Sequence, residues 1–283
     1  MEDNTITGEV KKKGWSFKII MFWVIAFLIT AGSAYYQRLT GPTYPSSGVV
    51  SFQGKDVKYK LDRSCDTSRN AVVKLENIDP TIKGFIEYKR FKTNDDKTLV
   101  EMKNDGGTLS AEFPTDKDRV YRVPAQKYEY RVILVKDNQK SEIPSEPVVL
   151  RFKGDVPLAI LLIHVIVIFS AMLVSTRAGL EFFNSNANYK KFALWALAIM
   201  TLGGMVLGPV VQKYAFGELW TGIPFGIDLT DNKTLIAWIA WIVAAVASFR
   251  SKNPGRWILG AALVTLIIFS IPHSVLSGNT PVK

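Results

Sequence analysis

Five long apolar runs constrain this chain of 283 residues more than any other feature of its sequence. They cover residues 17–36, 157–176, 192–211, 234–249 and 257–276. A helix that crosses a bilayer needs about 20 predominantly apolar residues. Four runs have that length. The run 234–249 is a little short, but its helix could begin near Asp231 or cross a locally thinned region of the bilayer. The sequence therefore predicts an α-helical integral membrane protein with five transmembrane helices.

The positions of lysine and arginine predict how these helices are oriented. Basic residues precede the first run (Lys11, Lys12, Lys13) or lie at its edge (Lys18). Others separate the second and third runs (Arg177, Lys190, Lys191) and the fourth and fifth (Arg250, Lys252, Arg256). Cytoplasmic loops carry the excess of Lys and Arg. Residues 1–16 are therefore expected in the cytoplasm, and residues 37–155 and the tail 277–283 outside it. The net charge of +10 comes largely from these topology signals and does not indicate nucleic-acid binding.

The first run predicts a retained signal anchor over residues 17–36. The small residues at 31–34, after the basic N-terminal stretch, would also suit the cleavage site of a signal peptide. The apolar run is longer than the usual h-region of 7–15 residues, and Trp23, Tyr35 and Tyr36 are typical interfacial anchors. Both interpretations export the segment that follows.

That exported segment, residues 37–155, has the pattern of an all-β domain. Ile86 and Tyr88 alternate with Glu87 and Lys89, which is typical of a strand with one buried face. Strands are expected at 49–52, 57–61, 71–75, 84–91, 98–102, 109–113, 128–135 and 148–152, with turn residues such as those at 104–107 between them. Several short strands over about 100 residues predict an antiparallel β-sandwich.

Residues 123–134 resemble the penultimate-strand region of fibronectin type III and immunoglobulin-like domains. The resemblance implies that Tyr128 packs the corner at the start of that strand. The exported segment has no histidine, and its acids are scattered among lysines as on a solvated surface. It is interpreted as a recognition module or as a spacer. Its Cys65 is the only cysteine in the sequence, so no intrachain disulfide is expected.

The chain has two histidines, His164 and His273, and both lie in apolar runs. The predicted topology places both toward the outer leaflet, where an ionisable side chain suggests a functional site. Three hypotheses stay open. The imidazoles can hydrogen-bond neighbouring helices; they can ligate a b-type haem axially; or they can form a metal or proton site with Asp228 and Asp231 of the outer loop.

Other residues of the membrane module, residues 157–276, have more ordinary expected roles. Asp228 and Asp231 precede an apolar run and are good helix N-caps. Gly204 and Gly208 form a small-xxx-small pattern that lets another helix approach closely, although the same space could receive a flat cofactor. Arg177 and Glu181 are four residues apart at a cytoplasmic helix end, where they can pair, and Arg177 could also hold a lipid phosphate.

A second resemblance covers most of the chain. The segments 39–45, 175–181, 208–217, 228–234 and 271–276 together resemble uncharacterised bacterial inner-membrane proteins with one exported β domain and a helical C-terminal part. No activity is known for such proteins, so the resemblance implies only this architecture and a location in the bacterial inner (cytoplasmic) membrane.

The sequence leaves two functions open. One is a membrane electron-transfer subunit that binds haem b through His164 and His273. The other is a non-enzymatic accessory, assembly or partner-binding protein that uses its exported domain on an envelope protein and in which the histidines are structural. No phosphate loop, zinc-protease motif, nucleophile elbow or kinase motif occurs, so an enzyme acting on its own is disfavoured. Membrane lipids are expected partners in both cases.

Overall fold

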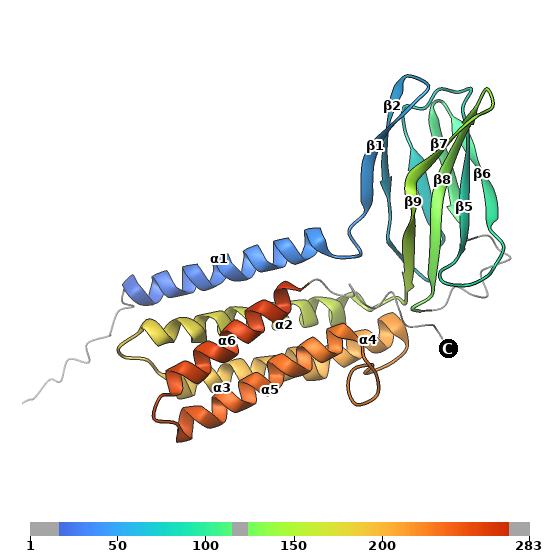
Figure 1. Cartoon of the computed structure of the whole chain (residues 1–283). Helices are drawn as coiled ribbons and strands as arrows, with labels where there is room; N and C mark the ends of the chain where they lie inside the picture. The colour runs from blue at the N-terminus through green and yellow to red at the C-terminus, as the bar shows by residue number, and fades with distance from the viewer. Residues whose placement is uncertain (1–16, 115–123, 272–283) are drawn as a thin grey trace, which may run out of the picture.

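The computed structural model describes residues 17–114 and 124–271, which form a helical module and a β domain (Figure 1). The helices are α1 (Phe17–Thr40), α2 (Leu158–Leu180) with the short turn η2 (Glu181–Phe183), α3 (Tyr189–Met200), the π-helical turn η3 (Thr201–Leu207), α4 (Gly208–Phe216), α5 (Leu229–Arg250) and α6 (Pro254–Ser270). The segments α3, η3 and α4 follow one another without a break. The described part of the helical module therefore contains five continuous helical segments, called rods below.

Four of these rods are long and apolar enough to cross a membrane: Phe17–Thr40, Leu158–Phe183, Tyr189–Phe216 and Leu229–Arg250. The fifth predicted transmembrane helix, 257–276, corresponds to α6, an apolar helix whose 17 residues make it shorter than the other four. Its predicted end, including His273, lies outside the described residues. The chain thus has the helices of an integral membrane protein; its described residues contain four candidate spans and the shorter apolar helix α6, where five spans were predicted.

Several helix ends differ from the prediction because capping residues set them. The third rod continues to Phe216 instead of residue 211 and stops at Gly217, whose φ of 86° is a left-handed C-cap. The fourth begins at Leu229 instead of residue 234, because the Asp228 side chain accepts hydrogen bonds from the first free N–H groups. The first continues to Thr40, four residues into the segment predicted to be exported.

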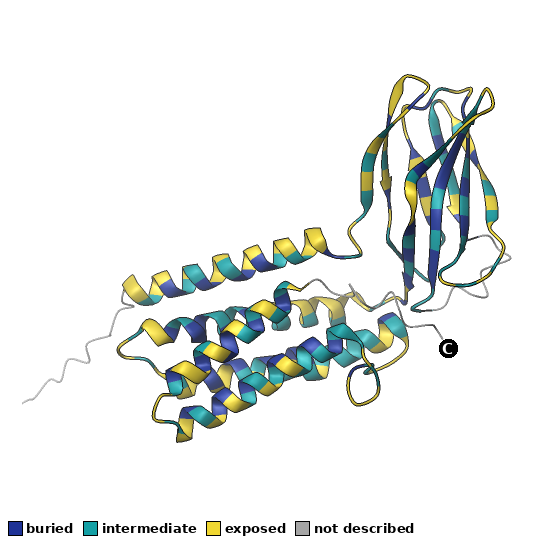
Figure 2. Cartoon of the chain, in the orientation of Figure 1, coloured by how far each residue is buried: buried dark blue, intermediate teal, exposed yellow. Residues whose placement is uncertain are grey.

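Burial separates the inner and outer faces of the helical module (Figure 2). Small residues and a few large ones fill the interior, among them Ala171, Ala196, Met200, Trp241 and Ala261. Large apolar side chains are exposed on the outside, including Phe27 and Leu28 on α1, Leu162 and Ile166 on α2, and Ile267 on α6. An apolar outer surface of this extent is typical of helices that face lipid.

The β domain stands at the end of the module where α1 ends and α2 begins (Figure 1). Its strands are β1 (Ser46–Phe52), β2 (Lys55–Leu61), β3 (Ser64–Asp66), β4 (Ala71–Leu75), β5 (Lys83–Arg90), β6 (Thr98–Asp105), β7 (Thr108–Phe113), β8 (Lys127–Lys136) and β9 (Gln139–Lys153). All eight predicted strands are found. The strand β3 was missed, because three residues are too few for an alternating pattern.

The sheet topology corrects the predicted sandwich. The strands form one continuous sheet in the order β3-β9-β8-β5-β6-β7-β4, and the hairpin β1–β2 lies against β4 and β9. The strand β6 pairs with β5 through its first half and with β7 through its end, so the two halves are not separate sheets. The domain is a nearly closed barrel, and its inward residues form one core.

Two tyrosines of β8 lie in that core. The hydroxyl of Tyr130 donates to the Asp62 carbonyl at 2.7 Å, and this contact ties β8 to the loop after β2. The Tyr128 ring lies edge-on to Tyr88 and Phe152. Tyr128 thus packs in the core at the start of β8, and the Tyr130 hydroxyl holds the backbone of the loop after β2.

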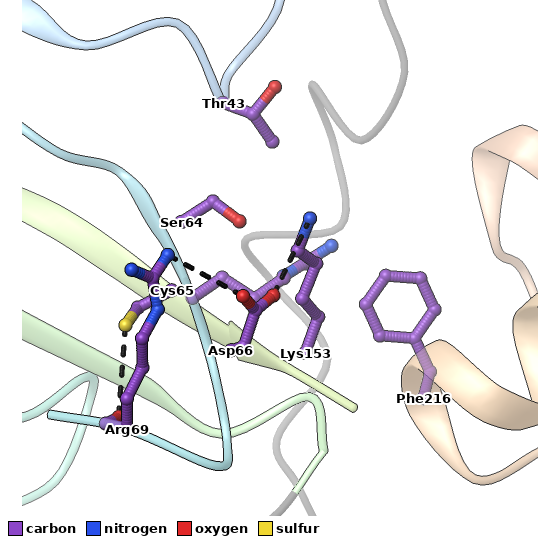
Figure 3. A pocket seen from close by; sticks show the side chains of 8 residues that line it. Thr43, Ser64, Cys65, Asp66, Arg69, Lys153 and Phe216 are labelled. Atoms are coloured by element: carbon purple, nitrogen blue, oxygen red, sulfur yellow. Dashed lines mark hydrogen bonds and ion pairs between the residues drawn. The ribbon is translucent and has the colours of Figure 1, made fainter. Parts of the chain in front are cut away.

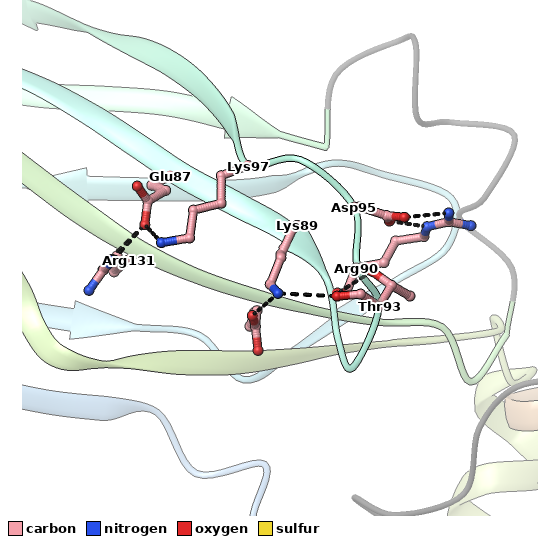
Figure 4. A network of polar contacts seen from close by, with 8 residues as sticks. Glu87, Lys89, Arg90, Thr93, Asp95, Lys97 and Arg131 are labelled. Atoms are coloured by element: carbon pink, nitrogen blue, oxygen red, sulfur yellow. Dashed lines mark hydrogen bonds and ion pairs between the residues drawn. The ribbon is translucent and has the colours of Figure 1, made fainter.

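Ion pairs cross the outer wall of the barrel (Figure 4). Glu87 Oε1 lies 2.9 Å from Lys97 Nζ and 2.8 Å from Arg131 Nη2. The Arg90 guanidinium donates two hydrogen bonds, of 2.5 and 2.9 Å, to the Asp95 carboxylate. These pairs join β5 to β6 and β8 and close the turn after β5. The pairs of Lys97 and Arg90 are partly exposed, and such pairs contribute up to about 1 kcal/mol each, so they support the sheet without dominating its stability.

We predict that Asp79 makes the stability of the barrel pH-dependent. Hydrogen bonds from the Thr81 hydroxyl and N–H, helped by nearby Lys136, lower the pKa of Asp79 from 3.8 to about 2. Because the folded pKa lies below the unfolded one, the contribution is complete above about pH 4 and is lost as the pH falls toward about 2. The urea midpoint of the barrel, read by pepsin cleavage, should fall across this window.

The matched variants are Asp79→Asn and Asp56→Asn, the second of which changes an exposed aspartate of β2. Asp79→Asn should flatten the decrease in the midpoint between pH 4 and pH 2, and Asp56→Asn should leave it as in the unchanged chain. An equal slope in all three proteins would contradict the assignment.

Candidate functional site

His164 lies on α2 beside the π-helical turn η3. An added Cβ on Gly208 would lie 3.9 Å from His164 Cε1, an ordinary van der Waals distance, so the imidazole lies near this glycine but does not fill the place of a side chain there. The ring also hydrogen-bonds to the backbone of Gly203. Its Nδ1 atom is buried and has no hydrogen-bond partner among the described residues. The predicted second imidazole, His273, lies outside those residues, so the structure does not show the pair.

The two glycines of η3 lack side chains, and atoms of neighbouring helices pack into the space beside them. An added Cβ on Gly204 would lie 2.6 Å from Thr234 Cγ2 of α5, and one on Gly203 would lie 3.2 Å from Ile168 Cα of α2. The backbone of Gly208 donates to the Gly203 carbonyl, five residues back, which is the wide turn of a π-helix. Helices α2 and α5 thus occupy the room that could have received a flat cofactor at Gly203 and Gly204.

Asp228 and Asp231 hold in place the loop 217–228, which connects α4 to α5. Asp228 accepts from the N–H groups of Thr230 and Asp231 and caps α5. Asp231 is buried, and its Oδ2 accepts from the Thr221 N–H at 2.6 Å, the Thr221 hydroxyl at 3.1 Å and Gln212 Nε2 at 3.0 Å. One carboxylate therefore joins α4, the loop after it and α5.

The two residues that follow Asp231 also bond to the backbone of neighbouring segments. Asn232 Oδ1 accepts from the Ile223 N–H at 2.7 Å. Lys233 is buried on α5, and its Nζ donates to the Ile271 carbonyl at 2.6 Å, so it fixes the end of α6. Within the described part of the chain, no group of three or more His, Cys, Asp or Glu side chains gathers as metal ligands. His164, Asp228 and Asp231, three of the four residues named for a metal, hence do not form such a group.

We predict that Asp231→Ala loosens the outer loop. It leaves buried donors of Thr221 and Gln212 without their acceptor, at an expected cost of about 2–3 kcal/mol. The measurement is hydrogen exchange of peptides that cover residues 217–228, which should become faster. Asp228→Ala is the matched control: it removes only a helix cap, worth about 1 kcal/mol. Equal exchange in the two variants would contradict the role given to Asp231.

At the opposite end of α2, Arg177 and Glu181 form a buried ion pair, as their spacing allows. Arg177 Nη1 lies 2.5 Å from Glu181 Oε1, and each side chain is only 2% exposed. The guanidinium lies 5.3 Å from the Phe22 ring centroid, 5.5 Å from that of Trp23 and 4.6 Å from that of Phe192. Aromatic rings from α1 and α3 thus surround the cation, which fastens both helices to α2.

A buried tryptophan at the centre of the module was not singled out from the sequence. Trp241 of α5 is fully buried, and its indole N–H lies 3.0 Å from both the Ser175 hydroxyl of α2 and the Thr265 hydroxyl of α6. Since Thr265 itself donates to the Ala261 carbonyl, its oxygen is free to accept. The three helices are thereby joined by hydrogen bonds as well as by packing.

The base of the β domain is held on the C-terminal end of α4. The Gly154 N–H, just after β9, donates to the Ala215 carbonyl of α4 at 2.8 Å. The guanidinium of Arg151 lies 5.5 Å from the centre of the Phe216 ring. Only four residues, 154–157, separate β9 from α2. A short link with contacts on both sides fixes the barrel relative to the module.

A hollow of about 340 Å³ opens at this junction (Figure 3). Asp66 and Arg69 from the barrel, Lys153 at the end of β9 and Phe216 of α4 point toward it, and Thr43 closes it on the side of α1. Asp66 lies 3.5 Å from Arg69 and 3.8 Å from Lys153. These residues are far apart in the sequence, and no sequence pattern indicated that they lie together.

Comparison with protein-family models and with curated proteins finds no matching family and no matching relative.

Proposed function

We propose that the chain is a non-enzymatic accessory protein of the bacterial inner membrane that displays its β-barrel at a fixed position above the outer leaflet, for recognition of an envelope protein. The observation that carries this proposal is the mounting of the barrel: the Gly154 N–H bonds to Ala215, Arg151 lies over Phe216, and four residues link β9 to α2. A domain that served only as a spacer would not need to be held in a fixed position on the helices.

The packing of the module supports the same proposal. Three charged residues at the end of the loop after α4 and at the start of α5 cap or hold helices: Asp228, Asp231 and Lys233. The N-terminus in the cytoplasm and the barrel outside follow from the distribution of Lys and Arg along the chain. The bacterial membrane is inferred from the resemblance described above.

The experiment is site-specific photo-crosslinking in intact cells from the barrel wall. Val72 on β4 and Leu99 on β6 are exposed apolar residues, 44% and 59% accessible, and suit a photoreactive side chain. Lys58 of β2 is an exposed position for the matched control. A recognition face should give an adduct of one mass from Val72 or Leu99 and none from Lys58. Equal, diffuse adducts from all three positions, or none from any, would contradict the proposal.

A second candidate is electron transfer through haem b, with His164 and His273 as axial ligands. It is favoured by one observation, the buried Nδ1 of His164 that no described residue uses. The test is a reduced-minus-oxidised visible spectrum of the purified chain after haem supplementation, beside His164→Ala and His273→Ala. A b-type signal that both variants lose would establish this function. A flat spectrum from folded protein would exclude it and leave His164 as a packing residue.

A further inference from the structure

Two hollows meet where α1, α2 and the barrel come together, and Thr43 lines both of them. The first is the junction hollow described above. The second, of about 450 Å³, lies between the end of α1 and α2 and is lined by Ala34, Tyr35, Arg38 and Phe169, among others. The two hollows differ in chemistry, because the first is lined by charged side chains and the second largely by apolar ones.

The junction hollow carries an excess of positive charge. Arg69, Arg151 and Lys153 line it with a single carboxylate, that of Asp66, which lies near Arg69 and Lys153. Arg38 of α1 adds a fourth cation at the mouth of the second hollow. Burial lowers the pKa of Arg151, so its positive charge is held in a partly desolvated position. An anion placed here would meet three lining cations and one lining carboxylate, with Asp228 near enough to Arg151 to act on its charge.

The second hollow continues this site along the membrane helices. Phe169 lies on α2, and Ala34 and Tyr35 lie on the last turns of α1, within two of the helices that are long enough to span a bilayer. The neighbouring surfaces of these helices are exposed and apolar, as at Leu161, Leu162 and Ile166 of α2. A ligand that fills both hollows therefore needs an anionic end beside the barrel and an apolar end between α1 and α2.

We propose that this junction binds one anionic glycerophospholipid of the outer leaflet. Its phosphate contacts Arg69, Arg151 and Lys153, and an acyl chain lies against Phe169 between α1 and α2. Arginine and lysine are the usual partners of phosphate, and the end of a spanning helix is the level of the headgroups. The lipid would complete the seat of the barrel, which goes beyond the display function proposed above.

The experiment uses the full chain in nanodiscs and native mass spectrometry of the released protein. Phosphatidylglycerol should stay bound as one molecule per chain, and phosphatidylcholine should not. The double variant Arg69→Gln/Lys153→Gln should weaken retention of phosphatidylglycerol by roughly thirtyfold, at about 1 kcal/mol for each lost cation. The matched control, Lys58→Gln/Lys74→Gln, removes two exposed lysines of β2 and β4 and should retain the lipid.

Further arms separate the lipid from other occupants and from misfolding. Arg69→Lys/Lys153→Arg keeps the charges and should restore retention, which shows that the double variant loses binding and not its fold. Inorganic phosphate at millimolar concentration should not displace the lipid, because it lacks the apolar part. The proposal is overturned if phosphatidylcholine is retained equally, if phosphate alone competes, or if lipid is retained only after residues 277–283 are deleted, which would make the chain's own tail the occupant.

Discussion

Glu181→Leu should destabilise the helical module by about 3–5 kcal/mol, because it leaves the buried Arg177 without its carboxylate. Both side chains are 2% exposed, and the described neighbours of Arg177 are largely aromatic rings. The rings of Phe22 and Phe192 attract the cation but cannot replace a carboxylate. Separation of α1 from α2 should accompany the loss, since Phe22 and Trp23 contact the cation from α1.

The measurement is unfolding by sodium dodecyl sulfate in bicelles, followed by tryptophan fluorescence. All seven tryptophans lie outside residues 37–155, so the signal reports the helices and not the barrel. The control is Arg177→Met/Glu181→Leu, which removes both charges and should recover most of the lost stability, because apolar groups of similar volume often replace a buried ion pair at little cost. If the double variant were as unstable as Glu181→Leu, the role of the unpaired charge would be refuted.

The second large effect is expected at Trp241. Trp241→Ala removes a fully buried indole at the contact of α2, α5 and α6 and should cost about 3–5 kcal/mol, mainly through the cavity it leaves. Trp241→Phe keeps most of the ring volume but loses the N–H that lies 3.0 Å from the Ser175 and Thr265 hydroxyls. That variant should cost only about 0.5–1.5 kcal/mol.

The same unfolding measurement, read by helical circular dichroism, checks these values. Trp195→Ala is the matched control, since Trp195 of α3 is 56% exposed and should contribute little to the packing. An equal loss of stability in Trp195→Ala and Trp241→Ala would contradict the assignment of Trp241 to the centre of the module.

Local patterns in the sequence predicted the strands well and their closure poorly. Alternation located β5 and β8 to within one residue at each end, because each has one face in the core. Pro144 and Pro147 hid the first part of β9, although the strand accommodates them at an irregularity in its pairing with β8. The pairings of β4 with β7, β5 with β8 and β3 with β9 join segments far apart in the sequence, so no local pattern distinguished a barrel from a sandwich.

The membrane module shows the same limit. The spacing of Arg177 and Glu181 predicted their pairing, but the rings of Phe22 and Phe192 come from helices whose relative positions the sequence does not give. An apolar helix has little periodicity to show which face is inside, so Trp241 was not recognised. The loop acids were weighed both as caps and as ligands. Only the structure shows that Asp231 reaches back to Thr221 and Gln212.

A pulsed dipolar distance measurement can show whether the barrel is held rigidly on the membrane helices. With Cys65 replaced by serine, spin labels are placed at two exposed positions, Lys58 on β2 and Glu218 just after α4. If the barrel is held rigidly, the two labels should give one narrow distance distribution in nanodiscs. Gly154→Leu should broaden this distribution, because a side chain at 154 has no room beside the Tyr214 carbonyl. A broad distribution in the chain without the Gly154 substitution would show a loosely tethered domain and contradict the account.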